Sequence, residues 1–257
     1  MAWVTVLGIP AAVYVMSVTA LMFFANEQQQ NPLLLLGAGL LTAGIYIFHR
    51  TSIVAVEPMQ ERHRIALRRK IPLRAVSCAC LVIAAYVFAL HKPVFSLLVI
   101  VSFMCVIAYG RKTVIKPLRA YLFLKPTAVG FAIVMFAWML NDMANSIPVV
   151  ICFILISSAD AMLCDAVDCE YDSASGCPTL AINLGEHWIK IITMLMYTIA
   201  SIGICFTSQH NPTLGVFFYI VFVVSAVFQK IDSRYLVDLR LVLVLLLAWG
   251  EWILWNG

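Results

Sequence analysis

The sequence predicts an all-α integral membrane protein with nine transmembrane helices. Of its 257 residues, 63% are hydrophobic and only 12% are charged, a balance that ordinary soluble domains do not show. The hydrophobic residues also gather in runs long enough, or nearly so, to cross a bilayer. We interpret residues 1–257 as one transmembrane domain. The predicted spans cover about residues 3–24, 32–49, 72–90, 93–109, 126–142, 147–164, 187–206, 213–229 and 237–255.

The distribution of positive charge predicts the orientation of these spans. With the N-terminus in the cytoplasm, sixteen of the 17 lysines and arginines lie in or beside cytoplasmic loops, and only Lys92 lies on the other side. This bias follows the positive-inside rule. We assign Arg240 to the last of these loops. The net charge of +4 therefore indicates topology and not nucleic-acid binding, and we expect a protein of the bacterial inner membrane.

An acidic run follows the sixth predicted span. Four of the 13 acidic residues fall within positions 165–172. On a helix, Asp165, Asp168 and Asp172 would share one face, where three carboxylates repel each other unless a cation lies among them. Mg²⁺ suits this role, because it binds one or two carboxylates together with substrate phosphates. The run therefore predicts a Mg²⁺ site for a phosphate-bearing substrate.

A second acidic pair follows the second predicted span. Glu57 and Glu61 stand four residues apart, so on a helix they would lie on one face. Basic residues follow them directly, so the two glutamates are either a second carboxylate pair or surface partners in salt bridges. The cytoplasmic loops contain the cations that could bind phosphate oxygens, which are Arg50, Arg62, Arg64, Arg69, Lys112 and Lys116.

Other polar residues inside the spans have simpler interpretations. Asp160, shortly before Asp165, should face the interior of the bundle, because an ionisable group at that depth is costly in lipid. We expect Asn141 and Asp142 to form a turn and Glu251 to reach the outer surface. Gly37 and Gly44 should allow close helix approach.

The acidic run and the residues after it resemble the UbiA superfamily of intramembrane prenyltransferases. The second signature of that family is D-x-x-D-x-x-x-D, then G-x-x-T-L and a short apolar run that ends in Leu-Gly. The matching residues here are Asp165, Asp168, Asp172, Gly176, Thr179, Leu180, Leu184 and Gly185. In the first signature, Glu57 and Glu61 stand at two of the aspartate positions, while Ile53 and Val54 replace the leading Asn-Asp. The helix order extends the resemblance over essentially the whole chain.

The resemblance implies helices around a central cavity that opens to the lipid, and a Mg²⁺-dependent enzyme that ionises an isoprenyl diphosphate. Asp165, Asp168 and Asp172 would hold one Mg²⁺ and Glu57 with Glu61 another. Arg50, Arg69, Lys112 and Lys116 would bind the diphosphate. The prenyl group would then pass to a lipophilic or aromatic acceptor.

Two alternatives stay open at this point. The altered first signature and the short loops also fit a terpene cyclase of the same superfamily, in which farnesyl or geranylgeranyl diphosphate cyclises through its own double bonds. The other alternative is a non-catalytic lipid-binding membrane protein. Three aspartates at helical spacing in an apolar segment argue against it, because they are costly without a metal.

Overall fold

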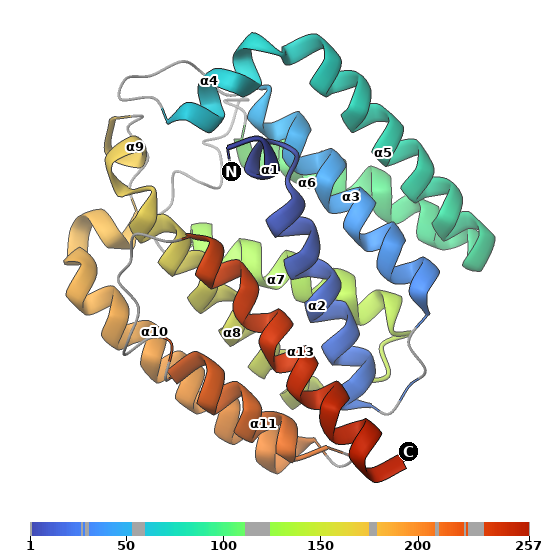
Figure 1. Cartoon of the computed structure of the whole chain (residues 1–257), viewed down its shortest axis with the longest axis vertical. Coiled ribbons are helices and arrows are strands. Elements are labelled where there is room, and N and C mark those ends of the chain that lie inside the picture. The colour runs from blue at the N-terminus through green and yellow to red at the C-terminus, as the bar shows by residue number, and fades with distance from the viewer. Residues whose placement is uncertain are drawn as a thin grey trace. The chain divides into compact units, whose positions relative to one another are not determined.

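The computed structural model describes residues 2–26, 28, 31–52, 60–110, 124–174, 179–208, 211–223, 225 and 234–256. Every regular element among these residues is a helix (Figure 1). The chain forms two compact units. The first comprises Met1–Met16, Asn31–Leu122 and Glu170–Pro178, and the second comprises Ser17–Gln30, Phe123–Cys169 and Thr179–Gly257.

The first unit is built on a helix pair. Helices α3 (Pro32–Arg50) and α5 (Lys70–His91) run side by side in Figure 1. At Gly37 the two helices are so close that an added Cβ would lie only 2.6 Å from the Phe88 ring. At Gly44 they are close enough for Ser77 Oγ to donate a hydrogen bond to the Gly44 carbonyl at 2.6 Å. The close approach expected at the two glycines is thus confirmed. The unit also contains α4 (Glu61–Arg68), η1 (Pro93–Phe95) and α6 (Ser96–Gly110).

The first predicted span is not one helix. Helix α1 (Ala2–Val6) ends before Gly8, and α2 (Ile9–Ala25) begins after it. Gly8 has a φ of +69°, and a Cβ there would lie 2.9 Å from Tyr46 Cβ. A positive φ is easy only for glycine, so this residue divides the span. The short α1 then packs against α4, with Val6 and Ala66 in one buried apolar cluster.

The second unit surrounds α8 (Ile147–Val167), which packs against α7 (Leu124–Leu140), α10 (Leu180–Thr207) and α13 (Arg234–Asn256). Helices α7 and α8 come very close at Gly130, where a Cβ would lie 2.6 Å from Ser158 N. Helix α11 (Thr213–Phe218) and the π-helical segment η3 (Tyr219–Val223) pack against α10. Because α8 packs against three other helices, the acidic run begins at the end of a largely enclosed helix.

The turn between α7 and α8 fastens the end of α2 within this unit. Asn141 and Asn145 are buried, and their side-chain amides donate to the Met22 carbonyl at 3.1 and 2.9 Å. Asp142 and Met143 have positive φ angles, as in tight turns. The predicted turn is confirmed, and its asparagines also satisfy a carbonyl in the last turn of α2.

Four described helices, α3, α5, α8 and α10, are long and apolar enough to cross a membrane. Four further apolar helices are shorter, at Ile9–Ala25, Pro93–Ile107, Leu124–Leu140 and Thr213–Val223. An integral membrane protein is indicated by these lengths and compositions. The count of nine spans and the orientation stay predictions.

Candidate functional site

The acidic run does not lie on one continuous helix. Helix α8 ends at Val167, Asp168 is its C-cap with φ −92° and ψ 9°, and α9 (Cys169–Ala174) begins at the next residue. Aspartate is a weak helix former that favours helix ends, which explains a break at this position. The expectation of one continuous helix through the three aspartates is therefore wrong. Asp165 lies on α8, Asp168 at the break and Asp172 on α9.

Asp165 is paired with a cation inside the second unit. Lys125 Nζ, from the first turn of α7, lies 2.8 Å from Asp165 Oδ1, and the two side chains are only 12% and 15% exposed. Sequence reasoning counted Lys125 among the loop cations and gave it no place in the site. The antiparallel order of α7 and α8 was a usable signal, because residues 125 and 165 lie at similar distances from the turn that joins the two helices.

The other end of the acidic run belongs to the first unit. Asp172 is buried there, 8% exposed. The adjacent Tyr171 ring lies 4.5 Å from the ring of His63, a buried residue of α4. Glu61 begins α4 and is exposed. The first unit thus places Asp172 on a segment that packs against the same short helix that starts at Glu61.

The predicted diphosphate ligands have different environments. Arg50 is buried at the end of α3, where its Nη2 donates to Tyr46 Oη at 2.9 Å and its guanidinium lies 4.6 Å from the Tyr46 ring centre. Arg69, between α4 and α5, is exposed. Glu57, Lys112 and Lys116 lie outside the described residues, so their assignments stay predictions.

The end of the signature has local structural roles. Thr179 is the N-cap of α10, and its hydroxyl accepts a hydrogen bond from Ile182 N at 3.3 Å. Gly185 has φ +80° and ψ 162°, which interrupts α10 after its first turn. Only glycine adopts this region readily. The Thr-Leu and Leu-Gly pairs therefore define how α10 starts after the acidic run.

A buried ionic cluster lies deeper in the second unit. Tyr197 Oη donates to Asp160 Oδ1 at 2.7 Å, and Arg240 Nη1 donates to Tyr197 Oη at 3.2 Å. Asp160, Tyr197 and Arg240 are at most 3% exposed. The expectation that Asp160 faces the interior is confirmed. The assignment of Arg240 to a loop is wrong, because α13 already begins at Arg234 and the pairing with Asp160 compensates the cost of a buried charge.

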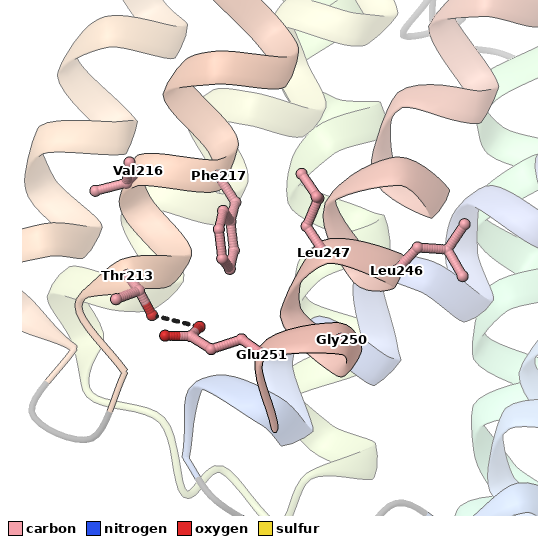
Figure 2. Close-up of a pocket in the computed structure, with 7 residues that line it drawn as sticks. All are labelled: Thr213, Val216, Phe217, Leu246, Leu247, Gly250 and Glu251. Carbon is pink, nitrogen blue, oxygen red and sulfur yellow. Dashed lines mark hydrogen bonds between the residues drawn. The ribbon is translucent and has the colours of Figure 1, made fainter. Parts of the chain in front are cut away.

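A shallow groove lies between α11 and α13, and none of the residues that line it is a predicted site residue (Figure 2). Its volume is about 490 Å³. It is apolar except at one end, where Thr213 Oγ1 donates to Glu251 Oε2 at 2.7 Å. Glu251 is half-buried, and the expectation that it reaches the outer surface stays a prediction.

The donor set of the acidic run fits magnesium. Its aspartates offer hard carboxylate oxygens, which Mg²⁺ prefers. Among the described residues, no three His, Cys, Asp or Glu side chains are gathered closely enough to hold a metal. Within the second unit the charge of Asp165 is balanced by Lys125.

Comparison with known proteins identifies the fold. Neither a protein-family model nor a curated relative matches the sequence. Two solved structures match over nearly the whole chain. One is the apo structure of a UbiA homologue from Aeropyrum pernix K1, with a TM-score of 0.64, 11% identity, and coverage of 95% of this chain and 98% of that one. The other is a UbiA homologue from Archaeoglobus fulgidus bound to DMAPP and Mg²⁺, with a TM-score of 0.63, 11% identity, and coverage of 98% of each chain.

This chain therefore has the fold of the UbiA homologues, and every regular element among its described residues is a helix. The resemblance seen in the acidic run is confirmed at the level of the fold. The matched residues of the second signature lie at the end of α8, on α9 and at the start of α10, except Gly176, which lies outside the described residues.

Proposed function

We propose that this protein is a Mg²⁺-dependent membrane prenyltransferase of the UbiA superfamily, which ionises an isoprenyl diphosphate and transfers its prenyl group to a lipophilic acceptor. The observation that carries the proposal is the acidic run at the end of α8 in a chain with the UbiA fold. The Archaeoglobus fulgidus homologue binds DMAPP and Mg²⁺, an isoprenyl diphosphate and the metal expected from the carboxylates here.

The residues divide into metal ligands and diphosphate ligands. The proposed metal ligands are Asp165, Asp168, Asp172, Glu57 and Glu61. The proposed diphosphate ligands are Arg50, Arg69, Lys112 and Lys116, to which the structure adds Lys125 as a candidate because it already lies at Asp165. Bound Mg²⁺ supplies neutralisation of the charge that develops on the leaving diphosphate.

Each set of side chains has a distinct part in the reaction. The lysines and arginines bind the diphosphate oxygens, so the electron pair of the allylic C–O bond can leave with the diphosphate. The apolar helices exclude water, which would otherwise capture the allylic cation. A nucleophilic atom of the acceptor forms the new bond to the prenyl carbon and loses a proton.

The proposal is tested with purified protein in lipid nanodiscs and dimethylallyl, geranyl, farnesyl or geranylgeranyl diphosphate. We expect diphosphate release that requires Mg²⁺ and stops with EDTA. Asp168→Asn should lower the rate by about 100-fold. Glu170→Gln is the matched control, because Glu170 is an exposed carboxylate of the same run outside the D-x-x-D-x-x-x-D positions, and it should keep the wild-type rate.

The products separate the remaining alternatives. A prenylated acceptor, formed when candidate aromatic and lipid acceptors are supplied, supports transfer. If cyclic hydrocarbon forms without any acceptor, the protein is a terpene cyclase and not a transferase. A protein that binds lipid but releases no diphosphate with any of the four substrates would be non-catalytic.

A further inference from the structure

The cluster of Asp160, Tyr197 and Arg240 joins three helices in the interior of the second unit. Tyr197 of α10 is its centre, because the hydroxyl bonds both Asp160 of α8 and Arg240 of α13. The guanidinium of Arg240 also lies 5.8 Å from the ring centres of Tyr197 and Phe222. All four side chains are buried. Helices α8, α10 and α13 and segment η3 are therefore held at one point by polar and aromatic contacts together.

Stability alone does not account for such a cluster. The direct contact between Arg240 and Asp160 is 3.8 Å long, so it lacks the short bidentate geometry of a strong Arg–carboxylate pair. Replacement of a buried ion pair by apolar side chains of similar size is often neutral or stabilising. Ionisable residues inside membrane segments usually serve a function, and the proposed reaction uses none of these three residues directly.

The position of the cluster on α8 suggests what that function is. Asp160 and Asp165 are five residues apart, which places them about 7.5 Å apart along the helix axis and about 140° apart around it. Asp160 is held by α10 and α13, whereas Asp165 contacts Lys125 of α7. The two contacts lie on different sides of α8. Together they determine the rotation of this helix about its axis.

Rotation of α8 would move the proposed metal ligands. A change in register by one residue turns a helix by about 100°, which would carry Asp165 and Asp168 away from their present directions. Tyr197 lies on α10, which begins at Leu180, shortly after the acidic run. The bond from Tyr197 to Asp160 therefore joins the helix before the acidic run to the helix after it.

We propose that Asp160, Tyr197 and Arg240 form a positioning network that orients α8, so that Asp165 and Asp168 are presented correctly to the metal–diphosphate. This inference rests on the proposed function and deepens it. None of the three residues needs to touch substrate or metal in this role, because they act through the helix that carries the ligands. Partners that orient metal ligands typically change metal affinity by 10- to 100-fold when they are removed.

The first test variant is Tyr197→Phe, which removes one hydroxyl and keeps the buried ring. Tyr219→Phe is the control, because Tyr219 lies in η3 of the same unit and is 46% exposed. The measurement is binding of radiolabelled geranyl diphosphate in nanodiscs as Mg²⁺ is titrated, with the unfolding temperature recorded for each variant. We expect Tyr197→Phe to raise the Mg²⁺ concentration for half-maximal binding by about 10-fold and Tyr219→Phe to leave it unchanged.

The second test variant separates orientation from charge balance. Asp160→Leu combined with Arg240→Met removes both charges, so the unfolding temperature should be kept or raised. A network that only balances charge predicts wild-type Mg²⁺ dependence in this double variant, and that result overturns the inference. Loss of Mg²⁺ affinity at an unchanged unfolding temperature supports it. If the wild-type protein does not bind geranyl diphosphate with Mg²⁺ at all, the proposed function fails as well.

Discussion

Replacement of Gly185 by alanine should destabilise the protein through the backbone alone. The residue has φ +80° and ψ 162°, a region that is essentially restricted to glycine. A Cβ at this position would meet no atom within 4 Å, so no steric clash with other residues adds to the effect. The expected loss in the free energy of unfolding is about 1–3 kcal/mol. This is a large part of the total stability of a typical protein, which is about 5–15 kcal/mol.

Gly250→Ala is a matched control for this prediction. Gly250 lies within α13, and a Cβ there would also meet no atom within 4 Å, but its φ is not positive. Alanine in a helix interior is more stable than glycine by about 0.5–1 kcal/mol. The two substitutions add the same methyl group to equally open space, so they should change the stability in opposite directions.

The assay is SDS-induced unfolding of each variant in mixed micelles, followed by circular dichroism. Gly185→Ala should also weaken Mg²⁺-dependent binding of a prenyl diphosphate, because α10 begins only a few residues after the acidic run. If Gly185→Ala is as stable as Gly250→Ala, α10 is continuous through residue 185 and the explanation of the Leu-Gly pair is refuted.

Three further substitutions test other parts of the second unit by the same unfolding assay. Asn145→Ala removes a donor to the Met22 carbonyl and should cost about 1–3 kcal/mol; an unchanged stability would show that the turn does not fasten α2. Ser157→Ala should be neutral or stabilising by up to about 1 kcal/mol, because the buried Ser157 hydroxyl makes no hydrogen bond within the described chain. Lys125→Met leaves Asp165 with a poorly solvated charge and should cost about 1.5–3 kcal/mol when EDTA is present, and a variant as stable as wild type would exclude a structural role for the 2.8 Å contact.

Helix positions were largely predictable because lipid-facing helices must be apolar over long runs. Runs such as 32–49 and 147–164 became α3 and α8 with small changes at their ends. The failures have local causes. Gly8 divides the first run through its positive φ. Asp168 ends α8, whereas the helical spacing of the three aspartates predicted one continuous helix.

The acidic residues of the candidate site were predictable, but the cations that pair with Asp165 and Asp160 were not. The aspartates stood out because carboxylates are rare beside apolar runs. Lys125 and Arg240 did not stand out, since a lysine or arginine near the end of a span is also what membrane orientation requires. Only the packing of α7 and α13 against α8 shows that these two cations lie at Asp165 and Asp160.

By itself, the sequence determined the helical class, the acidic run and its likeness to a family signature, because hydropathy and local spacing are properties of neighbouring residues. Tertiary structure decided which charges are paired and where the acidic run bends. These depend on contacts between residues far apart in the chain, such as Tyr197 with Asp160, which lie 37 residues apart. In an apolar interior each buried charge needs a partner, but many arrangements of helices could supply one, and only the packed fold selects among them.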